Sequence, residues 1–174
     1  MVRKVFYSFH YIPDSWRVQQ IRNIGTIEDN KPCSSNEWED VKKGGDAAIE
    51  KWINDQLNGR SCVIVLIGKE TAGRKWITYE IIKGWDEKKG ILGIYIHKLL
   101  DRDQKLTTKG DNPFDHVKLI GDGKPLSRFI KTYDPPYVTN TKVYGYIAEN
   151  LDSWIDDAIK VRSEFVVPKS GSTP

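Results

Sequence analysis

An unbroken apolar run, Cys62-Val-Ile-Val-Leu-Ile67, constrains this chain more than any other feature of its sequence. A run of this kind, rich in β-branched residues and without polar alternation, is typical of a strand in a parallel sheet that helices cover on both faces. Similar strands are expected over 4–10 and 91–97. The run is far shorter than the roughly 20 apolar residues of a transmembrane helix. We therefore expect a buried parallel sheet and no membrane span.

Helical patterns separate these strands. Apolar residues recur every three to four positions over about 13–24, 46–57, 74–89 and 140–161, as they do in helices with one buried face. Gly90 is expected to cap the third of these helices. The alternation of strand and helix predicts an α/β fold with a central, mostly parallel sheet.

The remaining segments carry weaker patterns. Residues 26–42 suggest a short strand at Thr26-Ile27, followed by a polar loop that carries Trp38. Residues 98–125 are long and polar, which is typical of a functional or disordered loop. A last edge strand is expected over 128–133. We expect one domain over 1–165 and a disordered tail over 166–174.

The composition excludes several classes of protein. Of the 174 residues, 39% are hydrophobic and 29% are charged, which suits one folded domain. Lys and Arg number 27 against 24 Asp and Glu, and the basic residues are spread along the chain. A nucleic-acid-binding protein would need them clustered, so this class is excluded. Cys33 and Cys62 are expected as free thiols, and no His or Cys has zinc-ligand spacing. Because the N-terminus lacks the apolar region of a secretory signal, we expect a cytoplasmic protein. Because the zinc-ligand spacing is absent, we expect no metal.

Trp76 and Glu80 are the strongest candidates for a functional site. Parallel sheets of this class bind ligands at the carboxyl ends of their strands, and the helix over 74–89 directly follows the central strand. Residues four apart lie on one helix face, so an aromatic ring and a carboxylate share one patch. Apolar neighbours of Glu80 predict either a raised pKa or a cationic partner. In the alternative interpretation, Trp76 is a half-buried core residue and Glu80 forms an ion pair with Lys83, Arg74 or another charge of the helix.

Five blocks of the chain, in order, carry a resemblance to a known family. They are Lys4-Val-Phe-Tyr-Ser-Phe-His10, Trp38-Glu-Asp-Val-Lys42, Val65-Leu-Ile-Gly68, Arg74-Lys-Trp-Ile-Thr-Tyr-Glu-Ile81 and Gly110-Asp-Asn-Pro-Phe-Asp115. Together they resemble the bacterial TIR-like family that includes the ThsB component of Thoeris anti-phage defence, over about residues 3–118. The resemblance implies a flavodoxin-like, TIR-type fold of three layers.

The resemblance also implies an activity. In this family a Trp-x-x-x-Glu pattern supplies the catalytic glutamate of an NAD-consuming enzyme, and Trp76 and Glu80 match it. The implied reaction cleaves the nicotinamide–ribose bond, with NAD as substrate and no cofactor. It makes a cyclic or otherwise modified ADP-ribose signal that diffuses to a separate effector. The identity of the product, self-association and a phage-derived activator are left open.

The end of the first strand is expected to contribute to substrate binding. Ser8, Phe9 and His10 stand there, and Phe9 and His10 could stack on the nucleotide or hydrogen-bond to it. His10 could equally be an ordinary loop residue.

Three more residues are weaker candidates for substrate binding. Trp38 could close over the base, or it could be a surface anchor for self-association. Lys69 and Arg74 could neutralise the pyrophosphate, although cations near the start of a helix are usually solvated. The loops over 38–45 and 98–125 are expected to border the same mouth as Glu80 and to control access.

A different class of function is the main alternative. A TIR-like fold can also serve as a non-catalytic module that binds a nucleotide or a protein, because fold does not determine function. A receiver-like phosphorylation switch would need acidic residues at the strand ends, and Ser8-Phe9-His10 and Gly68-Lys69 provide none.

Overall fold

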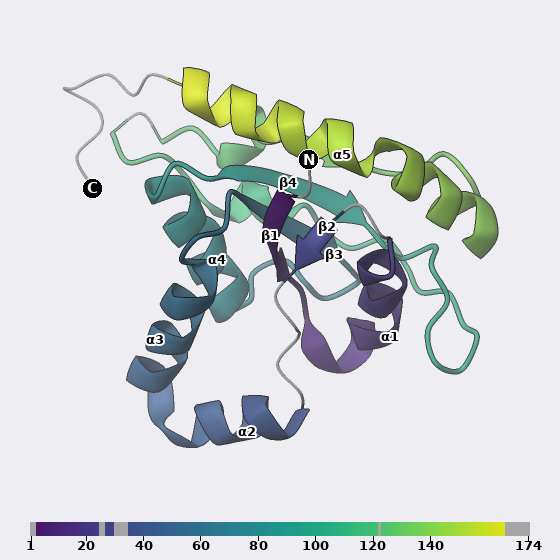
Figure 1. Ribbon diagram of the computed structural model, residues 1–174, viewed down its shortest axis with the longest axis horizontal. Coiled ribbons are helices and arrows are strands. Elements are labelled where there is room, and N and C mark those ends of the chain that lie inside the picture. Colours follow the sequence, from purple (N-terminus) through teal and green to yellow (C-terminus); the bar gives the residue numbers. More distant parts are fainter. Residues whose placement is uncertain (1–2, 25–26, 30–34, 122, 166–174) are drawn as a thin grey trace.

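Five strands form a parallel sheet at the centre of the molecule (Figure 1). The structure is a computed structural model that describes residues 3–24, 27–29, 35–121 and 123–165. The strands are β1 (Arg3–Ser8), β2 (Ile27–Asp29), β3 (Cys62–Ile67), β4 (Gly90–Tyr95) and β5 (Thr132–Tyr133). Their order across the sheet is β2-β1-β3-β4-β5, and all neighbouring pairs are parallel. The predicted α/β fold with a parallel sheet is therefore confirmed.

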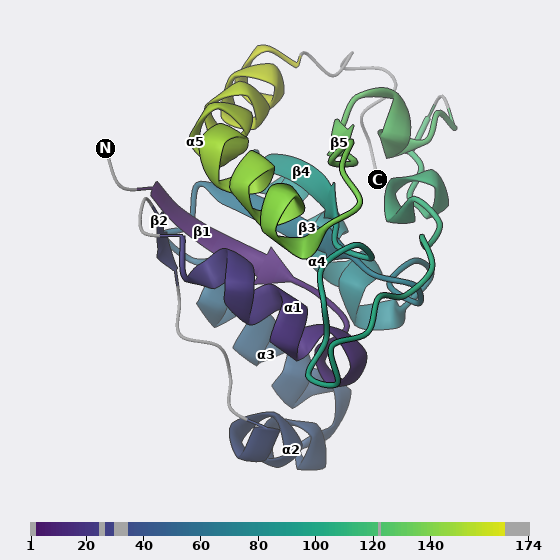
Figure 2. The ribbon, with the colours of Figure 1, turned by 90° about the vertical axis from the view of Figure 1, so that its right-hand side faces the viewer.

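Helices cover both faces of the sheet, as the apolar run of β3 predicts. On one face lie α1 (Tyr11–Arg22) and α5 (Asn140–Glu164), which stand in front of the strands in Figure 2. On the other face lie α3 (Gly45–Leu57) and α4 (Lys75–Asp86). Every residue of β3 and β4 is buried. Because side chains alternate along a strand, each central strand contributes to both apolar layers.

The structure differs from the sequence-based expectations in the segment before α3. Where a polar loop was expected, α2 (Ser35–Lys43) forms a helix whose neighbour is α3. The sequence Glu37-Trp38-Glu39-Asp40 is rich in charge and follows polar residues that are typical of loops, so its helical propensity was not recognised. Trp38 therefore belongs to a helix, and its side chain lies outside the described part of the chain.

Gly90 is not the cap of α4. It is the first residue of β4, and the left-handed backbone after α4 belongs to Lys88, with φ 61°. A Cβ at Gly90 would lie 2.7 Å from the backbone nitrogen of Ile159 in α5. The glycine is thus needed for the close approach of α5 to the sheet, and not for a turn.

The segment over 98–125 is held against the body of the protein. Arg17 in α1 donates from Nε to the carbonyl of Leu99 at 2.8 Å and from Nη2 to the carbonyl of Lys105 at 3.0 Å. Phe114, in the short 3-10 helix η1 (Pro113–His116), is fully buried and so anchors this segment. A second 3-10 helix, η2 (Leu126–Arg128), replaces the start of the expected edge strand.

Several further expectations concern the ends and the surface of the chain. Cys62 is a free, fully buried thiol, as predicted, whereas Cys33 lies outside the described residues. The expected tail over 166–174 also lies outside them. Within the described ranges, no helix combines the length and apolar character needed to cross a membrane.

Candidate active site

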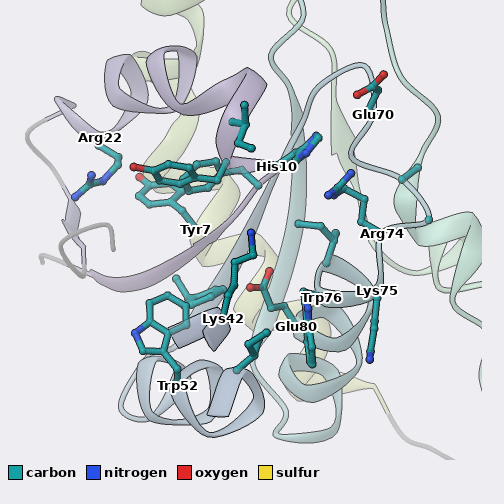
Figure 3. Close-up of a pocket in the computed structure, with 18 residues that line it drawn as sticks. Tyr7, His10, Arg22, Lys42, Trp52, Glu70, Arg74, Lys75, Trp76 and Glu80 are labelled. Carbon is teal, nitrogen blue, oxygen red and sulfur yellow. The ribbon is translucent and has the colours of Figure 1, made fainter. Parts of the chain in front are cut away.

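A cavity of about 690 Å³ opens where β1 and β3 end (Figure 3). The chain runs from β1 through α1 to β2 on one side, and then crosses β1 to continue with β3 on the other. At such a switch point the connections leave the sheet in opposite directions, which opens a crevice beyond the carboxyl ends of the strands. The walls come from Phe6 and Tyr7 of β1, from Phe9 and His10 after it, and from both ends of α1. The β3–α4 connection and α4 form the opposite wall, and α2 and α3 add one or two residues each.

Glu80 lies on the wall formed by α4. It shares the inner face of this helix with Ile77 and Ile81, which pack in the apolar layer below. The Glu80 side chain is therefore buried, with the residue only 8% exposed. The Ser8 hydroxyl, at the end of β1, donates a hydrogen bond to Oε2 of Glu80.

Burial controls the ionisation of Glu80. Loss of solvent raises its pKa to about 8, and the hydrogen bond from Ser8 acts in the opposite direction but does not cancel the effect. At neutral pH most copies of the free protein thus carry a protonated Glu80. A buried carboxyl of this kind is costly to ionise unless a positive charge binds beside it.

No ion pair to Glu80 occurs within the described residues, so the alternative interpretation of this glutamate is wrong. Lys83 pairs with Glu87 instead, with 3.5 Å between Nζ and Oε1. Arg74 lines the cavity from the position before α4 but forms no salt bridge with the carboxyl. Nothing in the described part of the chain therefore supplies the cation that a buried carboxylate needs.

Aromatic side chains form much of the remaining wall. Trp76 precedes Glu80 by one helical turn and is half-buried, with its ring edge-on to Tyr79 at a centroid distance of 5.8 Å. Trp52 of α3 lines the cavity as well, together with Tyr7 and Phe9. The planar faces available here suit a ligand with flat heterocyclic rings.

Cations gather around the rim of the cavity. Arg22, Lys42, Arg74 and Lys75 line it, whereas Glu70 is the one acidic side chain among the described lining residues besides Glu80. Figure 3 shows Lys42 and Glu80 pointing into the cavity from different helices. The excess of positive charge, together with the N-terminal end of α4, favours an anionic group at this rim.

His10 adds a neutral polar group to the wall. Its pKa is lowered by burial and, to a smaller extent, by the charge of Arg74, while Glu70 opposes the shift. Its Nδ1 atom is buried and has no hydrogen-bond partner among the residues that the structure describes. At pH 7 the imidazole is therefore neutral, with an unused polar atom beside the cavity.

The structure brings most of the predicted site residues together. Phe9, His10, Arg74, Trp76 and Glu80 all line the cavity, and Ser8 lies against Glu80. Lys69 does not line it; the side chain is exposed on the β3–α4 connection.

The access prediction is only partly met. Lys42, from the 38–45 segment, lines the cavity, whereas none of the described residues of 98–125 is among its lining residues, and control of access by that loop stays a prediction. The hydrogen bonds from Arg17 hold this segment against α1.

Sequence reasoning missed much of the wall, including the side chains of Arg22, Trp52 and Glu70. Only Trp52 had a detectable signal, because it follows Ile49 by three positions and so shares the inner face of α3. Arg22 is the last residue of α1, whose apolar periodicity identifies only the buried face of that helix. Glu70 lies in the β3–α4 connection, which has no periodic pattern.

Comparisons with known proteins agree with this arrangement. The family described as "Thoeris protein ThsB, TIR-like domain" matches residues 6–101, a range that contains the second half of β1 and the whole of β3, α4 and β4. ThsB1 of Bacillus cereus (strain MSX-D12), whose name describes it as a candidate cyclic ADP-D-ribose synthase, is 38% identical to this chain. The matched region covers 72% of this chain and 69% of that protein. The chain is therefore a member of the Thoeris ThsB TIR-like domain family.

Proposed function

We propose that this protein cleaves the nicotinamide–ribose bond of NAD and converts the ADP-ribose part into a cyclic nucleotide signal. The observation that carries the proposal is Glu80, a buried carboxyl with no cationic partner among the described residues, on the wall of a dinucleotide-sized cavity. The nicotinamide ring of NAD is positively charged and flat. It would supply the missing charge to Glu80 and stack on an aromatic wall such as Trp76.

The rim of the cavity suits the rest of the substrate. The pyrophosphate of NAD carries two negative charges, which Arg74 and Lys42 would neutralise. His10 is neutral and offers a hydrogen-bonding atom to a ribose hydroxyl or to the adenine. The cavity thus presents a carboxyl, aromatic rings and cations to the three chemically different parts of one molecule.

Bond cleavage would proceed with charge moving onto the sugar. The bond between the ribose C1″ and the nicotinamide nitrogen breaks, and its electron pair leaves with nicotinamide, which becomes neutral. The ribose then has oxocarbenium character, which the Glu80 carboxylate stabilises by its charge or by a transient ester to C1″. No general acid is needed, because nicotinamide leaves without taking up a proton.

The second step determines the product. A nucleophile of the ADP-ribose itself attacks C1″, and the proton that it loses passes to Glu80 or to water. A carboxylate with a pKa of about 8 is basic enough to accept such a proton near neutral pH. A closed cavity that excludes water would favour ring closure over hydrolysis to linear ADP-ribose.

The proposal extends to a role in anti-phage defence. The name of the similar Bacillus cereus protein describes a cyclic ADP-D-ribose synthase, and the matching family belongs to Thoeris systems. We propose that the product of this chain likewise diffuses to a separate effector, without a metal, nucleic acid or membrane taking part. Activation by a phage component and self-association belong to the same proposal.

Product analysis tests the proposed reaction. Extracts of phage-infected and uninfected cells that produce the wild-type protein would be separated by liquid chromatography and analysed by mass spectrometry. We expect a new nucleotide with the mass of ADP-ribose minus one water, together with released nicotinamide, in infected cells. Linear ADP-ribose alone would contradict cyclisation, and unchanged NAD in both extracts would contradict the enzymatic function and favour a non-catalytic binding module.

A further inference from the structure

We infer that Ser8 is a positioning residue that holds Oε2 of Glu80 and leaves Oε1 for the substrate. The inference rests on the proposed function, in which Glu80 is the group that acts on the ribose. It also gives Ser8 a different role from the substrate binding that the sequence predicts. The argument comes from the alternation of β1, the burial of Ser8 and the chemistry of its hydroxyl.

The alternation of β1 places Ser8 on the same sheet face as α4. Phe6 packs in the apolar layer formed by α3 and α4, whereas Val5 and Tyr7 pack in the layer on the opposite face. Ser8 follows Phe6 by two residues and so lies on the α3 and α4 side. It pairs in register with Val65 of β3, which keeps the strand end fixed beside the first turns of α4.

Burial separates Ser8 from the ligand space. The residue is 1% exposed and is not among the lining residues of the cavity. A serine hydroxyl has a single proton to donate, and Ser8 donates it to Glu80. Its donor capacity is therefore already used on the carboxyl, and the substrate contacts come from other residues.

The hydrogen bond also has an electrostatic effect. A donor to a carboxylate stabilises the charged form, so Ser8 opposes the burial that keeps Glu80 protonated. The other ionisable side chains that line the cavity are those of Tyr7, His10, Tyr11, Arg22, Lys42, Glu70, Arg74 and Lys75. Burial and the Ser8 hydrogen bond together account for the pKa of Glu80. Removal of the hydroxyl should therefore raise this pKa further.

Three variants isolate this role. Ser8→Ala removes the donor, and Ser8→Thr keeps a hydroxyl on the same strand position. The matched control is Ser61→Ala, because the Ser61 hydroxyl donates to the backbone carbonyl of Lys4 near the amino ends of β1 and β3, away from the cavity. Melting temperatures of all three variants show whether each one is folded.

The decisive readout is the titration of Glu80, measured by ¹³C NMR of the carboxyl carbon and assigned with Glu80→Gln. We expect the midpoint in Ser8→Ala to rise by about one pH unit, and in Ser8→Thr and Ser61→Ala to stay within a few tenths of the wild-type value. The rising limb of kcat/KM for NAD should shift equally, which lowers kcat/KM about tenfold at pH 7.

Failure of the role of Ser8 and failure of the proposed function give different results. An unchanged Glu80 midpoint in folded Ser8→Ala overturns the role of Ser8, whatever the turnover. If Ser8→Ala does not fold, Ser8→Cys replaces it, because cysteine keeps the size of the side chain but is a weaker donor. An unchanged Glu80 midpoint in Ser8→Cys would also overturn the role of Ser8. A shifted midpoint supports the inference even in the absence of turnover, whereas wild-type protein that leaves NAD intact would overturn the proposed function alone.

Discussion

The carboxylate of Asp14 lies directly against the Cα of Gly68, so that a Cβ at Gly68 would come within 2.1 Å of Oδ2 of Asp14. Asp14 is buried in the first turn of α1, and Arg17 donates to its Oδ1 at 3.1 Å. Gly110 closes the same junction, because a Cβ there would lie 2.1 Å from the carbonyl oxygen of Gly68. Three segments, the start of α1, the end of β3 and the 98–125 segment, are thus locked together beside the cavity.

Substitution of Gly68 by alanine should therefore destabilise the protein by at least about 2 kcal/mol, since the new methyl group would clash with the buried Asp14 side chain, which Arg17 holds in place. Gly145→Ala is the matched control. Gly145 lies in α5, and a methyl group added there would have no neighbouring atom within 4 Å outside its own helix, so alanine should stabilise by about 0.5–1 kcal/mol. Urea unfolding followed by tryptophan fluorescence measures both changes. Equal stability of the two variants would show that the junction is not rigid.

Arg74 and Lys69 provide a test of the charged rim. Both cations are exposed on the same β3–α4 connection, but only Arg74 lines the cavity. Arg74→Gln should raise KM for NAD about tenfold, because it removes a bidentate partner for the pyrophosphate. Lys69→Gln should change KM less than about twofold. Steady-state kinetics at two salt concentrations measures these values, and similar KM values for the two variants would place the pyrophosphate elsewhere.

The raised pKa of Glu80 predicts a pH-dependent penalty on stability. The pKa is about 8 in the folded protein against an ordinary value of 4.5, so the folded state retains a proton that the unfolded state loses between these values. Stability therefore falls as pH rises from about 4.5 to about 8. Glu80→Gln cannot ionise and should melt several degrees above the wild type at pH 8, with almost no difference at pH 4.5. Calorimetry at both pH values tests this, and a constant difference in melting temperature would contradict it.

Arg162 is predicted to stabilise the end of the molecule away from the cavity. Its Nε and Nη2 donate to the carbonyl of Trp85 at 3.1 and 2.9 Å, and its guanidinium lies 4.3 Å from the centre of the Trp85 ring. Arg162→Ala should cost about 2–3 kcal/mol of stability, because a charged hydrogen bond and a cation–π contact are lost from a buried position. The exposed Lys160→Ala should cost less than about 0.5 kcal/mol. Both free energies can be measured by denaturant unfolding, with NAD turnover of the two folded variants expected to equal that of the wild type.

The sequence predicts best those strands in which every residue is buried. Every side chain of β3 is buried, so its apolar run alone identifies a central strand, and β4 follows the same logic. The helix α2 was missed because its nine residues include only two apolar ones, Trp38 and Val41, too few for a recognisable helical period. Its position depends on packing against α3, which is a tertiary effect.

The candidate site shows a similar limit. Trp76 and Glu80 were predictable because helical spacing places them on one face, and the strand order brings that face to the sheet edge. Lys69 and Arg74 have the same chemistry and stand five positions apart, yet only one reaches the cavity. That difference comes from the course of the β3–α4 connection, which no periodicity in the sequence records.

The most direct test of the central claim compares two glutamates on the wall of one cavity. Glu80 is buried against Ser8, whereas Glu70 is exposed on the rim. Release of nicotinamide from NAD would be measured for folded Glu80→Gln and Glu70→Gln under conditions in which the wild type is active. We predict a loss of at least about 100-fold for Glu80→Gln and a change of less than about threefold for Glu70→Gln. Wild-type turnover by Glu80→Gln would contradict the assignment of Glu80 as the catalytic carboxylate.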